Sequence, residues 1–148
     1  MGVGSDLRQD DASGLIVAQR LISLENIKRN FDIKVIISYT APENFTGEII
    51  NYKPSHLIII DSANSGVEPA TVSLVNYDEV ESSSFCTHAL SLHVLIKYLK
   101  DYEELKNMKI IFLGIQPEGL EFNEKITDKV SESIDELSVI LEKTIKGL

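Results

Sequence analysis

Short apolar runs alternate along the chain with segments whose apolar residues recur every three or four positions. Such runs are typical of buried strands, and the three-to-four spacing is typical of helices that pack by one face. The pattern predicts strands over residues 34–38, 56–61 and 109–113, with a weaker edge strand over 71–76. It predicts helices over 12–24, 88–99 and 126–145, and a short helix within 42–51. Strands that alternate with helices indicate an α/β fold with a largely parallel sheet.

The most apolar strand points to a first candidate site residue. Its unbroken run Leu57-Ile58-Ile59-Ile60 indicates burial on both faces, hence a central position, and Asp61 follows directly. Open α/β sheets bind ligands just outside the carboxyl ends of their strands, so Asp61 stands where a functional carboxylate is expected. An equally good interpretation is that Asp61 caps the next turn through the backbone amides of residues 62 and 63.

The first residues resemble the turn that joins a first strand to a helix. Gly2-Val3-Gly4 would form this turn, yet only Met1 precedes it, so the sequence predicts that the first strand is missing. A true start further upstream is the favoured explanation. Asp10 and Asp11 then precede the helix, where either could cap it and the other could lie in its first turn.

A third segment supplies a nitrogen ligand. His88 is predicted to open a helix, where the helix dipole disfavours a protonated imidazole and so favours the neutral form that binds metals. An α/β fold would bring the acidic pair Asp10-Asp11, Asp61 and His88 to one edge of the sheet. Two oxygens and one nitrogen, with open coordination positions, suit a divalent transition metal. His56 and His93 lack this setting and are interpreted as structural.

Cys86 lies two residues before His88, but we expect it to be a small buried apolar residue. Cysteine enzymes bring their histidine from elsewhere in the chain, so the pair does not indicate a thiol nucleophile. Nucleotide binding is also disfavoured: Gly2 and Gly4 fit part of the dinucleotide-binding pattern, but Leu7 occupies the place of the third glycine.

Composition excludes several other classes. The length of 148 residues predicts one domain over residues 1–148. With 14 basic and 23 acidic side chains the net charge is −9, which disfavours nucleic acids and anionic membranes as partners. The single cysteine excludes an internal disulfide and suits a reducing cytoplasm. No apolar run approaches the roughly 20 residues of a membrane helix, and no secretory signal is visible.

Taken in order, several segments resemble the nickel–iron hydrogenase maturation endopeptidases. They are Gly2 to Gly14, Leu57 to Pro69, Phe112 to Pro117 and the loop Ala41-Pro42-Glu43-Asn44. The closer match is to the subgroup that processes membrane-associated, hydrogen-evolving hydrogenases. The resemblance extends over almost the whole chain and implies a single α/β domain, with a twisted, mostly parallel sheet flanked by helices on both faces. Ser5 stands where the family usually has asparagine.

The resemblance also implies an activity. Family members remove a short C-terminal extension from the hydrogenase large-subunit precursor after nickel has been inserted. Carried over by motif, the metal-binding and catalytic residues are Asp11, Asp61 and His88. The nickel is expected to arrive with the precursor, although another divalent metal can occupy the site in vitro. The expected enzyme is a cytoplasmic monomer, with a docking cleft shaped by the loops 41–44, 63–69 and 116–122.

Two other functions are compatible with the same residues. A general metallopeptidase would carry its own zinc, although the chain has no His-Glu-x-x-His motif. A non-catalytic chaperone would sense nickel loading of the precursor and leave its cleavage to another protein.

Overall fold

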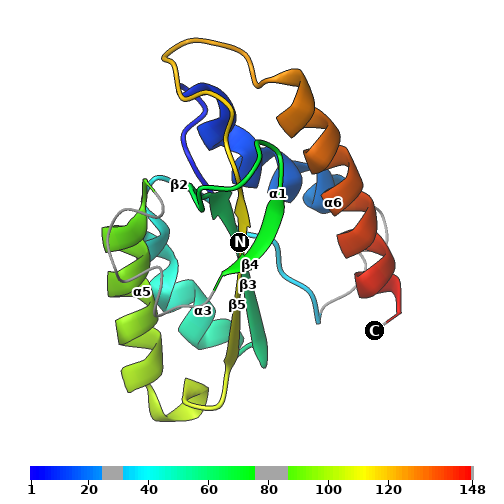
Figure 1. Cartoon of the computed structure of the whole chain (residues 1–148). Coiled ribbons are helices and arrows are strands. Elements are labelled where there is room, and N and C mark those ends of the chain that lie inside the picture. Colours follow the sequence, from blue (N-terminus) through cyan, green and yellow to red (C-terminus); the bar gives the residue numbers. More distant parts are fainter. Residues whose placement is uncertain (25–31, 76–86, 148) are drawn as a thin grey trace.

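The computed structural model describes residues 1–24, 32–75 and 87–147. The strands among them form one twisted sheet of five, in the order β2-β1-β3-β5-β4 (Figure 1). Four strands are parallel, and the edge strand β4 runs antiparallel to β5. Their bounds are Gly2–Val3 (β1), Ile37–Tyr39 (β2), His56–Ser62 (β3), Val72–Val75 (β4) and Lys109–Ile115 (β5).

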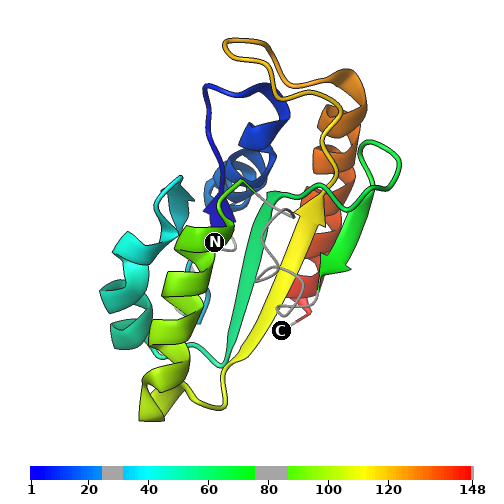
Figure 2. The ribbon, with the colours of Figure 1, turned by 60° about the vertical axis from the view of Figure 1, so that its left-hand side comes forward.

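Helices cover both faces of this sheet (Figures 1 and 2). On one face α1 packs beside α6, and on the other α3 packs beside α5. The α-helices among the described residues are Ser13–Ser23 (α1), Thr46–Tyr52 (α3), Ala89–Asp101 (α5) and Asp128–Lys146 (α6). Short 3₁₀ helices occur at Gln9–Ala12 (η1), Pro42–Phe45 (η2) and Glu103–Leu105 (η3). The predicted α/β class, mostly parallel sheet and two helical layers are confirmed.

The apolar run in β3 is explained by burial on both sides of the sheet. Ile59 belongs to the core beneath α3 and α5, together with Leu92 and Leu95 of α5. Its neighbour Ile60 belongs to the core beneath α1 and α6, together with Ile134. Because successive side chains of a strand point to opposite faces, a central strand needs apolar residues at every position. β3 therefore holds Asp61 in a fixed place at the carboxyl edge.

The prediction that the first strand is missing is wrong. Gly2–Val3 forms β1 and lies between β2 and β3, with Gly2 paired to both Ile37 and Ile60. A strand of two residues is too short to produce a recognisable hydrophobic pattern, which is why the sequence did not show it. Gly14 lets α1 cross this strand closely, since a Cβ there would lie 2.4 Å from the Val3 carbonyl oxygen.

Several predicted boundaries shift in the structure. The strand expected over 34–38 begins at Ile37, the helix expected from 126 begins at Asp128, and the helix expected over 88–99 runs over Ala89–Asp101. The predicted edge strand is confirmed as β4, while Asn76 lies outside the described residues. In the part of the chain that the structure describes, none of the helices has the length and apolar character needed to cross a membrane.

Candidate metal and catalytic site

Asp61 lies at the carboxyl end of β3 and is completely buried. Its Oδ1 accepts a hydrogen bond from the Ser62 amide at 2.8 Å, as expected, but the Ala63 amide donates to the Ile115 carbonyl oxygen instead. Both carboxylate oxygens also lie 3.3 Å from Nδ1 of His88. The two interpretations of Asp61 are therefore compatible, because one oxygen serves the turn and the carboxylate as a whole faces an imidazole.

Asp11 enters the site from η1 and is also fully buried. The turn before it needs Gly4, whose φ is +145° and whose Cβ would lie 2.0 Å from the Asp11 carbonyl oxygen. The Ser5 amide donates to Asp11 Oδ2 at 3.0 Å, whereas Asp11 Oδ1 is buried without a hydrogen-bond partner. A buried oxygen without a donor costs free energy, and a bound cation would satisfy it.

His88 is the N-cap residue of α5, which confirms the prediction that it lies at the start of a helix. It is 7% exposed, and its Nε2 lies 3.8 Å from Asp11 Oδ2 while Nδ1 faces Asp61. Each of the three residues offers a ligand atom, and these atoms lie within 4.8 Å of one another. The fold thus brings together three side chains from distant parts of the sequence into a cluster that could hold a metal ion.

The electrostatics of the cluster also favour a cation. Burial raises the pKa of Asp61, with a further rise from the Asp11 charge, although the hydrogen bond from His88 opposes it. Burial opposes protonation of His88, but its hydrogen bond to Asp61 and the charges of Asp61 and Asp11 outweigh this, so the pKa of His88 is raised. The predicted preference of His88 for the neutral form is therefore wrong for the metal-free protein. Two buried carboxylates therefore attract positive charge, which a divalent ion supplies more strongly than a proton.

Asp10 has a different role from its neighbour, and the sequence did not reveal it. Its Oδ2 accepts from the amides of Glu118 and Gly119, each at 2.9 Å, and its Oδ1 accepts from the Thr127 amide at 2.8 Å. The expectation that Asp10 or Asp11 caps α1 is wrong, because the N-cap position is Ala12 and no side chain bonds there. Asp10 instead fastens η1 to the segment that leads into α6.

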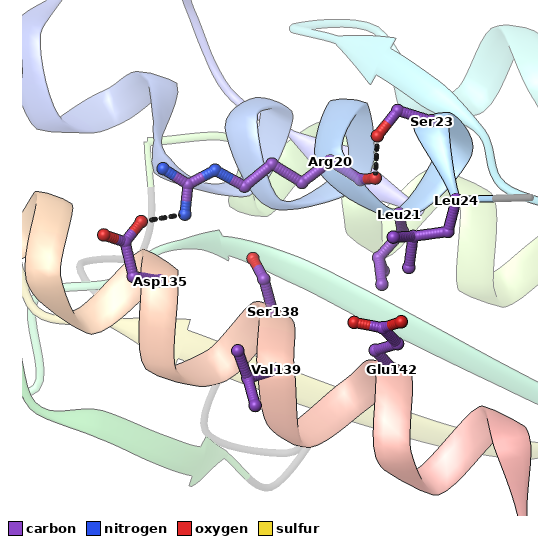
Figure 3. A pocket seen from close by; sticks show the side chains of 8 residues that line it. All are labelled: Arg20, Leu21, Ser23, Leu24, Asp135, Ser138, Val139 and Glu142. Carbon is purple, nitrogen blue, oxygen red and sulfur yellow. Dashed lines mark hydrogen bonds and ion pairs between the residues drawn. The ribbon is translucent and has the colours of Figure 1, made fainter.

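The other residues singled out in the sequence stay apart from this cluster. Cys86 lies outside the described residues. Among the described residues the metal-ligating group contains neither His56 nor His93. A separate cavity of about 360 Å³ lies between α1 and α6 (Figure 3). It is lined by Arg20, Leu21, Ser23, Leu24, Asp135, Ser138, Val139 and Glu142, so it contains none of the three candidate ligands.

Fold and site together define an α/β protein with a buried Asp-Asp-His cluster at the carboxyl edge of its sheet. Residues 20–144 match the family model of the HycI hydrogenase maturation proteases. The hydrogenase 3 maturation protease of Escherichia coli K12 is 30% identical over 134 residues, covering 90% of this chain and 81% of that protein. A Methanocaldococcus jannaschii protein assigned to the same class is 35% identical over 152 residues, covering 100% of this chain and 88% of its own length.

Solved structures agree with the sequence comparisons. The crystal structure of the HycI NiFe hydrogenase maturation protease from Thermococcus kodakarensis has a TM-score of 0.83 and 26% identity, covering 98% of this chain and 89% of that one. The chain therefore belongs to the HycI-type hydrogenase maturation protease family. The predicted fold and activity are confirmed: the protein is a peptidase that cleaves the C-terminus of a hydrogenase large-subunit precursor.

Proposed function

We propose that Asp11, Asp61 and His88 bind the nickel ion carried by the precursor and that they are the catalytic residues. The observation that carries this proposal is the buried cluster itself, in which one oxygen of Asp11 has no partner. Two carboxylates and one imidazole leave coordination positions for ligands from the precursor. In this way the enzyme would test whether nickel has been inserted and would fix the scissile peptide beside the metal.

The residues of the cluster also suit hydrolysis of that peptide. A metal with open positions can polarise a peptide carbonyl or activate a water molecule. Asp11 and Asp61 lie within the same buried cluster, so a carboxylate oxygen of either residue that does not bind the metal is placed to accept the proton of the attacking water. The proton then passes to the amine that leaves, and burial keeps other water away from the reaction.

Three loops would form the docking cleft around this site. They are 41–44, 63–69 and 116–122, which follow β2, β3 and β5. Because these three strands are parallel, the loops after them gather at the same edge of the sheet as Asp61. A peptide lying across this edge would meet all three loops and the metal-binding cluster together.

The substrate that we propose is the large subunit of a hydrogen-evolving hydrogenase, processed in the cytoplasm by a monomeric enzyme. The similarity to the hydrogenase 3 maturation protease supports this subgroup. A single cysteine suits a reducing compartment.

The test is cleavage of the large-subunit precursor, with and without nickel, followed by mass spectrometry. We expect a short C-terminal peptide to be released only from the nickel-loaded precursor. Asp11→Asn, Asp61→Asn and His88→Gln should abolish release while remaining folded. Asp6→Asn is the matched control, because Asp6 is an exposed carboxylate in the turn that precedes Asp11. Equal cleavage of nickel-free precursor, or full activity in all three site variants, would disprove the proposal.

A further inference from the structure

Arg8 stands beside the metal-binding cluster without having been assigned a role. Its carbonyl oxygen accepts a hydrogen bond from the Asp11 amide at 2.8 Å, so its backbone is fixed relative to that ligand. Its guanidinium carbon lies 5.3 Å from the centroid of the Phe122 ring. Arg8 and Phe122 are also joined by an antiparallel backbone bridge. Arg8 is therefore held in place from two sides of the site.

This arginine lacks the acidic partner that several other cations of the protein have. Arg20 pairs with Asp135, Lys53 with Glu104 and Lys129 with Glu118. In the described parts of the chain, Arg8 forms no ion pair with a carboxylate, and its Nε is buried without a hydrogen-bond partner. A chain with 23 acidic residues offers many possible partners for an arginine. A partly buried guanidinium that pairs with none of them indicates a hydrogen-bond donor whose acceptor belongs to a bound ligand.

The surroundings of Arg8 place this donor at the mouth of the site. Its partner Phe122 ends the loop 116–122, which follows β5 at the same edge of the sheet as Asp61, and Arg8 itself lies three residues before Asp11. The neighbouring apolar side chains are exposed, Leu7 by 58% and Phe122 by 66%. The Asn123 amide donates to the Leu7 carbonyl oxygen at 2.9 Å and holds the two segments together. A peptide that reached the metal would therefore pass an apolar rim containing one fixed positive charge.

We propose that Arg8 is a further substrate-binding residue, which donates hydrogen bonds to the carbonyl oxygen of the scissile peptide. This inference rests on the proposed function and adds a residue to it. When the oxygen of water bonds to the carbonyl carbon, the carbonyl π pair moves onto the oxygen. The carboxylate base takes the water proton and returns it to the amine as the carbon–nitrogen bond breaks. Arg8 stays protonated throughout and stabilises the negative oxygen.

Arginine is suited to this role and lysine less so. The guanidinium keeps its charge at every pH of interest and presents several N–H donors in a rigid plane. The cation–π contact with Phe122 holds the guanidinium without using an N–H donor, and Nε has no hydrogen-bond partner. Preorganised donors of this kind act on charge that develops in the transition state, so their removal lowers kcat more than it raises KM.

The test is cleavage kinetics on the nickel-loaded precursor for wild type, Arg8→Met and Arg8→Lys. We expect kcat of Arg8→Met to fall by about 10² to 10³, with KM changed by less than about threefold. Arg8→Lys should retain part of the rate, and millimolar guanidinium should restore part of the activity of Arg8→Met. Arg20→Met is the matched control, because it removes the same charge from the cavity between α1 and α6 and should leave both constants unchanged.

Three results would overturn the inference about Arg8. One is cleavage by Arg8→Met within about threefold of wild type. Another is a rise in KM with kcat retained, which would mean that Arg8 holds an acidic group of the precursor instead. The third is an equal loss in Arg20→Met. If thermal melting shows that Arg8→Met is unfolded, the kcat and KM of Arg8→Lys are compared with those of wild type to test the inference instead. If wild type itself fails to cleave the nickel-loaded precursor, this counts against the proposed function. That result differs from the three results above, in which wild type is active.

Discussion

The adjacent residues Asp10 and Asp11 have different roles at this site. Asp10 has its oxygens fully used by backbone amides and the Thr127 hydroxyl, so it stabilises the fold. Asp11 keeps one buried oxygen without a partner and lies near another buried carboxylate, Asp61. Carboxylates left in this state cost stability and are typical of functional sites. The stability of the metal-free protein should therefore respond differently to substitution at the two positions.

We predict that Asp10→Asn lowers the free energy of unfolding by about 2 kcal/mol or more. The NH2 group of the asparagine would face backbone N–H groups that donate hydrogen bonds to Asp10 in the wild type. Asp11→Asn should leave this free energy unchanged or raise it slightly, because it removes repulsion from Asp61. Urea denaturation of both metal-free variants measures the difference. Equal losses of stability in the two variants would contradict this division of roles.

The cluster also makes stability depend on pH. The pKa values of His88 and Asp61 are both raised in the folded protein. A group with a raised pKa binds its proton more tightly when folded, so its contribution is complete below its unfolded pKa and is lost as pH rises through the folded value. For His88 this loss begins above its ordinary pKa of 6.5.

We therefore expect the Tm of the metal-free protein to fall as pH rises above about 6.5. Nickel competes with the bound protons, so the increase in Tm on adding nickel should grow with pH. Thermal melting between about pH 6 and pH 9, with and without nickel, tests both trends. His88→Gln should weaken both, since it removes the imidazole whose pKa is raised in the folded protein. An increase in Tm that is independent of pH would contradict the proposed ligand set.

At the scale of elements, the sequence predicted the helices and strands that have a hydrophobic pattern of their own. It missed the elements that form only through contacts with distant residues. The apolar run in β3 and the helical spacing of α6 were sufficient to identify both elements. β1 was missed because two residues have no pattern of their own and are a strand only through their pairing with β2 and β3. The loop after β3 is likewise shaped by contacts with residues far along the chain.

Ala70 gives a test of such a loop. It ends this loop with φ +71°, a conformation that costs an L-residue about 1 kcal/mol. Its amide donates to the Gln116 carbonyl and its carbonyl accepts from Ser133, so distant segments hold it there. We predict that Ala70→Gly is neutral or stabilising by up to about 1 kcal/mol. Ala18→Gly in α1 should destabilise by about 1 kcal/mol or more. A clear loss of stability in Ala70→Gly, measured by urea denaturation, would contradict the strain argument.

At the scale of the molecule, the site is built from three segments that the parallel sheet collects at one edge. Asp61 and His88 could be proposed from the sequence because one ends an apolar strand and the other begins a helix, whereas Asp11 was chosen over Asp10 only by the family resemblance. The roles of Arg8 and Asp10 could not be proposed, because they come from contacts with the segment 118–127, more than 100 residues away. Local pattern identifies candidate ligands, whereas the groups that position them depend on the completed fold.

The same edge should bind the precursor, and an exposed residue there tests this at the level of the whole molecule. Val67 lies in the loop 63–69 and is 42% exposed. A charge at this position would meet the docked peptide, so we predict that Val67→Glu raises KM about tenfold, which corresponds to about 1.4 kcal/mol of lost binding. Its kcat and Tm should stay near those of wild type.

Val139→Glu provides the matched control for this prediction. Val139 is 47% exposed and lines the cavity between α1 and α6, away from the three loops. The same added charge at this place should leave KM for the precursor unchanged, because the peptide is expected to cross only the carboxyl edge of the sheet. If both variants raise KM equally, the effect comes from the net charge of an already acidic protein, and the docking cleft must lie elsewhere. A selective effect of Val67→Glu would instead place the precursor on the loop that begins two residues after Asp61.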